Sequence, residues 1–158
     1  MILPRGITRF NVPKGHPGPD RRGFLGDCWQ AAVGLRGRVD DQLQVADWVC
    51  VNFDAWRVVL PGGEVTALLN HVHPWIGFCR PREPGSLQLD FVEPGRLGAA
   101  LADVGRYRVL TQAELLSPMT ELMAGELRKG ERTQLKYWGK LAGRGKLRVG
   151  DVVFNFWD

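Results

Sequence analysis

The sequence predicts an α+β domain whose antiparallel sheet of five to six strands occupies about residues 45–92 plus 107–110. Between Val45 and Val92, short apolar segments alternate with turn-forming residues. The segments are 45–53, 56–60, 65–70, 75–79 and 87–92, and the breaks are Asp54-Ala55, Pro61-Gly62-Gly63, His73-Pro74 and 81–85. Connections this short join neighbouring antiparallel strands, because a parallel crossover needs a dozen or more residues.

An N-terminal helix and C-terminal helices are expected to cover one face of this sheet. The first helix begins after Asp20, its cap, and ends at Gly37. Its apolar residues recur at the spacing of one helical face: Phe24, Leu25, Cys28, Trp29, Ala32 and Val33. Asp40-Asp41, which follows, is predicted to be a solvated turn.

The C-terminal half predicts further helices and one strand. Glu93-Pro94 starts a helix with the stripe Leu97, Leu101 and Val104, and Gly105 ends it. Residues 107–110 form a short strand, and Thr111 with Glu114 matches a capping box. Ser117-Pro118 restarts the chain in a helix that ends near Gly130 and turns Met119, Leu122, Met123 and Leu127 inward.

The last segment, 149–157, is interpreted as a helix. It carries three aromatic residues close to the C-terminus, Phe154, Phe156 and Trp157. Each large ring left in water forgoes about 1.5–3 kcal/mol of burial. Docking onto the sheet is therefore expected, and a contact surface for a partner is the alternative.

Length and composition predict a single domain over residues 1–158. A chain of 158 residues is long enough to bury a sufficient core. Residues 1–19, rich in Pro and Gly, form an irregular N-terminal arm. Without a membrane span or signal peptide, the chain is expected to be cytoplasmic. Cys28, Cys50 and Cys79 read as buried thiols in a reducing compartment.

The most enzyme-like string is Asn70-His71-Val72-His73-Pro74. Two histidines at i and i+2 of a strand share a face, so His71 and His73 are weak candidates for a metal site, with Cys79 and Asp90 as possible further ligands. A thiol–imidazole pair of Cys79 with either histidine is a second possibility. The simpler interpretation is that both histidines end a strand and hydrogen-bond the turn.

No cofactor is predicted, because the usual motifs fail. The glycine- and lysine-rich residues 139–147 match neither a P-loop nor the dinucleotide fingerprint. Ser86 and Ser117 lie at element starts, outside any nucleophile elbow.

A basic segment lies near the C-terminus. Residues 126–148 hold eight Lys or Arg against two Glu. Cations interleaved with aromatic residues suit single-stranded nucleic acid, which needs charge for phosphates and rings for stacking. The interaction candidates are Lys136, Trp138, Lys140, Arg144, Lys146 and Arg148.

The sequence favours a protein-interaction module, an inhibitor, adaptor or regulatory subunit. Six tryptophans in a chain without an evident catalytic centre fit this class, because Trp, Tyr and Arg often dominate interface energetics. A nucleic-acid-binding protein that uses residues 136–148 is the alternative, and a metal- or thiol-dependent enzyme around His71 and His73 is the third hypothesis. The partner's identity and the oligomeric state are not predicted.

Overall fold

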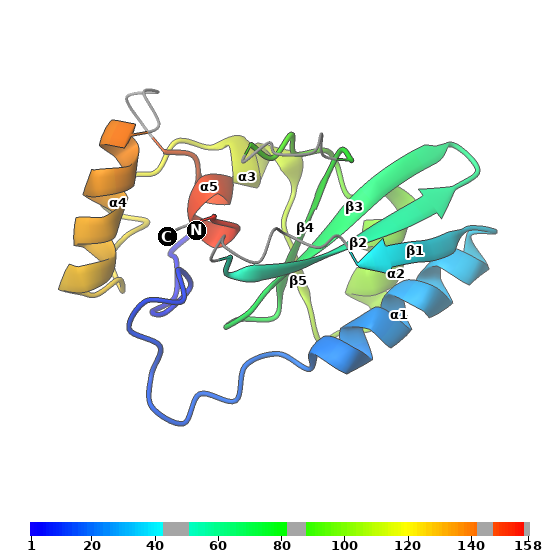
Figure 1. Ribbon diagram of the computed structural model, residues 1–158, viewed down its shortest axis with the longest axis horizontal. Helices are drawn as coiled ribbons and strands as arrows, with labels where there is room; N and C mark the ends of the chain where they lie inside the picture. The colour runs from blue at the N-terminus through cyan, green and yellow to red at the C-terminus, as the bar shows by residue number, and fades with distance from the viewer. Residues whose placement is uncertain (43–50, 82–87, 142–146, 157–158) are drawn as a thin grey trace.

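The protein is an α+β domain with a five-stranded mixed sheet (Figure 1). The computed structural model describes residues 1–42, 51–81, 88–141 and 147–156. The strands are β1 (Arg38–Gln42), β2 (Phe53–Leu60), β3 (Gly63–Asn70), β4 (Trp75–Cys79) and β5 (Arg108–Val109), in spatial order β1-β2-β3-β4-β5. The helices are α1 (Arg21–Gly34), α2 (Gly95–Asp103), α3 (Gln112–Leu116), α4 (Lys129–Leu141) and α5 (Val149–Val153).

The antiparallel part of the sheet follows the expected hairpins. Strands β2 and β3 pair from Phe53–Asn70 to Leu60–Gly63, so Pro61 and Gly62 make the turn. Strand β3 then pairs antiparallel with β4. The predicted break at Asp54-Ala55 is wrong, because β2 runs through both residues.

Strand β1 corrects the turn predicted at Asp40-Asp41. Residues 38–42 pair antiparallel with β2, and Val39 is buried. An ion pair of 2.8 Å joins Arg38 to Asp40 along the strand. Pairing with β2 therefore outweighs the local turn preference of the two aspartates. Most of the strand expected at 45–53 lies outside the described residues.

Strand β5 is present as expected, but the prediction of an antiparallel strand is wrong. It pairs parallel with β4, through Trp75–Arg108 and Ile76–Val109. The connection from β4 runs through α2 and is long enough for a parallel crossover. The strand expected at 87–92 is reduced to a bridge between Cys79 and Phe91.

Helix α1 begins as the sequence predicts. The Asp20 carboxylate accepts a hydrogen bond of 2.9 Å from the Gly23 amide. Its buried face holds Phe24, Cys28 and Ala32, whereas Trp29 and Val33, both expected on that face, are exposed. The helix ends at Gly34 rather than at Gly37, in a Schellman motif whose left-handed residue is Arg36, with φ of 60°.

Helices lie on both faces of the sheet, not on one face as predicted. Alternate residues of each strand point to opposite faces, and they enter two separate cores. Helices α1 and α2 cover the first, which includes Phe24, Trp56, Ile76, Phe78 and Leu101. The second contains residues of the N-terminal arm, α3 and α5, among them Leu3, Phe53, Leu68, Leu115 and Val152.

The helix predicted from Pro118 to Gly130 is wrong. Residues 121–126 form turns, the rest of 119–128 is irregular, and α4 begins only at Lys129. Backbone groups there bond to other segments: the Leu3 amide donates to the Met123 carbonyl, and the Met119 amide to the Leu147 carbonyl, both at 2.8 Å. Leu122, expected inside, is 78% exposed.

The C-terminal aromatics are docked, as expected. Helix α5 is shorter than predicted, but Phe154 and Phe156 are buried against Phe53. Phe154 also packs on Gly77, where a Cβ would lie 2.7 Å from the ring. Trp157 lies outside the described residues.

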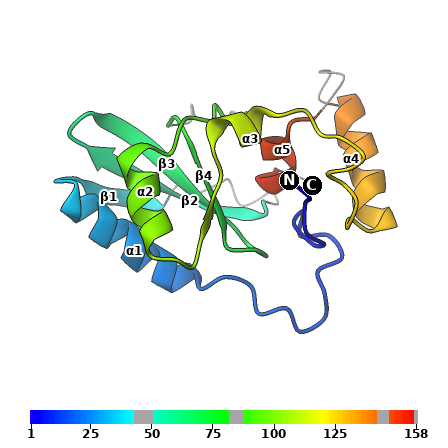
Figure 2. The same ribbon diagram turned by 180° about the vertical axis from the view of Figure 1, so that it is seen from behind.

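Three buried asparagines, Asn52, Asn70 and Asn155, join the two ends of the chain to the sheet. The side-chain amides of Asn52 and Asn70 both donate to the carbonyls of Ile7 and Val153, at 2.7–3.0 Å. The backbone amide of Asn155 donates to Asn52 Oδ1 at 2.7 Å. The N-terminal arm and α5 accordingly lie side by side in both views (Figures 1 and 2).

None of the helices in the described part of the chain combines the length and the apolar composition needed to cross a membrane.

Candidate functional site

All three histidines of the chain gather around the turn that follows β3. His71 and His73 lie in the turn, and His16 reaches it from the N-terminal arm. His16 Nε2 lies 2.6 Å from the Val72 carbonyl oxygen, and His73 Nε2 lies 2.9 Å from that of Arg5. The rings of His16 and His73 are 5.0 Å apart. The imidazoles of His16 and His73 therefore hold the arm against the turn.

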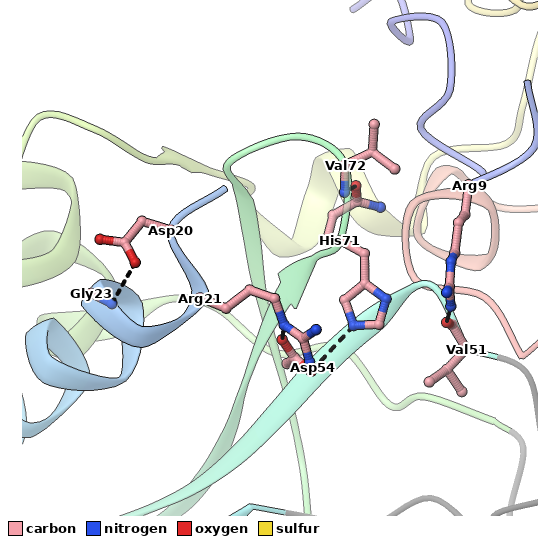
Figure 3. A network of polar contacts seen from close by, with 9 residues as sticks. Arg9, Asp20, Arg21, Gly23, Val51, Asp54, His71 and Val72 are labelled. Atoms are coloured by element: carbon pink, nitrogen blue, oxygen red, sulfur yellow. Dashed lines mark hydrogen bonds and ion pairs between the residues drawn. The ribbon is translucent and has the colours of Figure 1, made fainter. Parts of the chain in front are cut away.

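His71 contacts a buried carboxylate. The Oδ1 atom of Asp54, on β2, lies 3.2 Å from His71 Nε2. Arg21, the first residue of α1, donates to both carboxylate oxygens of Asp54 (Figure 3). Burial by itself would raise the pKa of Asp54, but the hydrogen bonds from His71 and Arg21 outweigh it and lower that pKa below its ordinary value. The carboxylate is therefore ionised and ties α1 to the sheet.

A carboxylate also contacts the histidine of hydrolytic triads, but there through Nδ1, whereas Asp54 contacts His71 through Nε2. The described residues place no serine or thiol beside it. Cys79 lies at the far end of the β3–β4 ladder, where it pairs with Thr66. Burial raises the pKa of the other described thiol, Cys28, to about 12, and the charge of Asp27 adds to this shift.

The residues considered for a metal site are not brought together. His71 and His73 bond to separate partners, and Asp90 pairs with Arg80 at 2.9 Å on the surface. Residues 1–42, 51–81, 88–141 and 147–156 hold no group of three His, Cys, Asp or Glu that suits a metal ion.

The free energy of unfolding is expected to fall as the pH drops below 6.5. Burial lowers the pKa of His73 below its ordinary 6.5; the bond to the Arg5 carbonyl opposes this shift, and the charge of His16 adds to it. An imidazole with a lower pKa in the folded state contributes stability above pH 6.5, because the unfolded chain takes up the proton first on acidification. Glu131 and Glu126 act in the opposite direction.

Urea denaturation at pH steps from 7.5 to 5.5 measures this dependence. His73→Gln keeps a donor for the Arg5 carbonyl but does not titrate, so its stability should change less than that of the wild type. Equal slopes for both proteins would rule out His73 as the titrating group.

Of the predicted interaction residues, Lys136 and Lys140 lie exposed on α4. Trp138 is half-buried, with Nε1 donating to Gln134 at 3.1 Å. Arg148 lies at the start of α5, where it pairs with Asp151 at 2.6 Å and stacks on Phe91. Arg144 and Lys146 lie outside the described residues.

Four cations lie along one side of helix α4. Lys129, Arg132, Lys136 and Lys140, spaced by three or four residues, share one side of the helix; we call these four residues the α4 cationic face. Arg132 also donates to the carbonyls of Gly125 and Leu127, both at 3.0 Å. The three lysines form no ion pair with any residue that the structure describes.

The one acidic residue of α4 points inward. Glu131 is fully buried, and its carboxylate accepts hydrogen bonds from the Gly6 amide, the Thr8 hydroxyl and the Arg128 amide, each at 3.0 Å. Its charge is thus bound by the N-terminal arm. Lys129, Lys136 and Lys140 face solvent, whereas the guanidinium of Arg132 lies 3.9 Å from the exposed Glu121 carboxylate.

The chain matches no known protein family, curated protein or solved structure. Function is therefore inferred from the chemistry of these surfaces.

Two exposed aromatic residues border the α4 cationic face. Tyr137 is 56% exposed. Phe10 is 48% exposed, and its ring lies 3.7 Å from the Cβ position of Gly130, seven residues before Tyr137. Asn11 fills the space that a side chain at Gly130 would take.

The sequence hypothesis missed Lys129, Arg132 and Phe10. The prediction placed Lys129 at the end of a helix that does not form and Arg132 in the segment after it. Had α4 been placed correctly, the spacing 129, 132, 136 and 140 would have identified its basic side. Nothing local in the sequence places Phe10 beside that helix.

Proposed function

We propose that the protein is a protein-interaction module that binds an acidic partner protein through the α4 cationic face. The observation that carries this proposal is the outer side of α4, where exposed lysines have no acidic neighbour on the helix. Lys129 and Lys140 are eleven residues apart, which corresponds to about 16 Å along the helix. Opposite charge on a partner would speed association and select the partner.

The apolar neighbours of this face favour a protein as the partner. Phe10 and Tyr137 border it, and Ile2 and Leu122 flank the backbone hydrogen bond from Leu3 to Met123. Ile2 is 50% exposed and Leu122 is 78% exposed. Aromatic residues beside charged residues resemble the apolar centre and polar rim of protein interfaces.

The backbone that carries Phe10 is also held in place before binding. Arg9 and Asn11, on either side of Phe10, have φ values of 68° and 56°, which non-glycine residues adopt rarely. The Phe10 amide donates to the Thr8 hydroxyl, which in turn donates to the buried Glu131. A rigid loop of this kind loses little conformational entropy when a partner binds.

Nucleic acid is the second candidate. Exposed lysines next to the exposed Tyr137 ring provide charge for phosphates and a surface for base stacking. If Lys129, Lys136 and Lys140 each neutralised a phosphate of a single strand, the slope of log K against log salt would be about −2.

The test compares charge-reversal variants. Lys136→Glu/Lys140→Glu brings the net charge of the α4 cationic face to zero, because two glutamates then offset Lys129 and Arg132. Arg36→Glu/Arg96→Glu makes the same change in net charge on two exposed residues, one just after α1 and one within α2, and both helices lie at the other end of the molecule from α4 (Figure 1). Each tagged protein is used for capture from nuclease-treated lysate of its native cells, and the captured proteins are purified and titrated directly.

We expect an acidic protein that binds the wild type and the control variant equally, and the α4 variant about tenfold or more weakly. Binding should also weaken as salt rises. A protein captured equally by all three would contradict the proposal. Direct titration with a single-stranded oligonucleotide tests the second candidate. Nucleic-acid binding requires that the wild type and the control variant bind the oligonucleotide and that the α4 variant does not.

A further inference from the structure

Helix α1 carries an apolar stripe on its outer side that nothing in the described structure covers. The α1 stripe consists of Arg22, Gly26, Trp29 and Val33, which lie within about 60° of one another around the helix. All four are exposed, Trp29 by 44% and Val33 by 63%. The exposed tryptophan and valine, one turn apart, form a small apolar patch on the helix.

The order of residues along the α1 stripe is self-complementary. Gly26 and Trp29 lie at equal distances on either side of the helix midpoint between residues 27 and 28, and so do Arg22 and Val33. A second α1 helix packed antiparallel about a twofold axis at this midpoint would place each Trp29 against the other copy's Gly26. It would also place each Val33 against the other copy's Arg22.

We propose that the α1 stripe is a homodimer interface, in which Trp29 of each copy fills the hollow over Gly26 of the other. A Cβ at Gly26 would meet no atom within 4 Å, so the position is open to a ring from outside. Burial of both indoles removes the largest apolar groups of the stripe from water.

The charges of the stripe are compatible with this pairing. Arg22 is its one charged residue, and it falls opposite Val33 rather than opposite its own equivalent. The methylene groups of an arginine can cover a valine while the guanidinium stays in water. Asp27, the nearest carboxylate at the midpoint, is already bound by Arg106 and Tyr107, each at 2.5 Å.

The pairing is expected to be weak. A single helix from each copy buries less than the roughly 1,200 Å² of a stable interface. We therefore expect a concentration-dependent dimer with a Kd on the order of 100 μM.

Sedimentation equilibrium of the full chain tests the proposal. The concentrations run from about 10 μM to about 1 mM, a range that brackets this Kd. Gly26→Gln fills the hollow at a site where the monomer has free space, and it replaces a poor helix former by a better one. Gly34→Gln is the matched control, because Gly34 is exposed and equally open but lies about 110° around the helix from the centre of the stripe.

The wild type and Gly34→Gln should dimerise with the same Kd, and Gly26→Gln should raise the Kd at least tenfold without lowering its Tm. A wild type that stays monomeric at 1 mM would overturn the proposal, as would a dimer that Gly26→Gln leaves intact or that Gly34→Gln weakens equally. Lys136→Glu/Lys140→Glu should leave the dimer unchanged, so the outcome is independent of partner binding at α4.

Discussion

Replacing Asn70 by Asp is expected to lower the free energy of unfolding by about 3–5 kcal/mol at neutral pH, the range for an uncompensated buried charge. Asn70 is fully buried; its amide donates to the Ile7 and Val153 carbonyls, and its oxygen accepts from the Val72 and His73 amides. Aspartate keeps the acceptor, but it sets a carboxylate oxygen against two carbonyl oxygens. Urea denaturation at pH 7.5, about neutral, measures the difference.

The loss should shrink on acidification, because a protonated carboxyl regains one donor for these carbonyls. The quantity to compare is therefore the difference between variant and wild type at each pH. Asn11→Asp is the control with the same charge change on an exposed residue, and its effect should stay within about 0.5 kcal/mol. A similar effect of both substitutions would contradict a structural role for the buried asparagines.

Replacing Glu131 by Ala is expected to lower the free energy of unfolding by about 3 kcal/mol. The substitution leaves three donors without their acceptor: the Gly6 amide, the Thr8 hydroxyl and the Arg128 amide. Two of these belong to the N-terminal arm, so its docking against α4 should weaken most. Chemical denaturation gives the total loss, and hydrogen exchange of the amides of residues 3–9 locates it.

Glu126→Ala provides the comparison, since Glu126 is an exposed carboxylate five residues earlier. Its effect should not exceed about 0.5 kcal/mol. If Glu131→Ala behaves like Glu126→Ala, the carboxylate does not hold the arm.

Local signals predicted the elements that depend on a few neighbouring residues. Asp20 caps α1, and Thr111 and Glu114 form the expected capping box at α3, because each motif satisfies backbone groups within four residues. The hairpin of β2 and β3 was predicted for the same reason, through its turn at Pro61 and Gly62.

Elements that rely on distant partners were predicted poorly. Strand β1 exists because β2 supplies its hydrogen bonds, and residues 119–128 stay out of a helix while their backbone bonds to Leu3 and Leu147. The parallel direction of β5 depends on the path of α2 across the sheet. None of these partners lies within the window of a local pattern.

The candidate surfaces divide in the same way. The amino-acid pattern alone predicted the α+β class, the basic character of the α4 region and the presence of histidines after β3. Long-range packing set the rest: Glu131 is buried while the lysines stay exposed, Phe10 borders them, His71 meets Asp54, and Trp29 faces solvent. Composition and local spacing are properties of a segment, whereas burial and contact depend on what the rest of the chain packs against it.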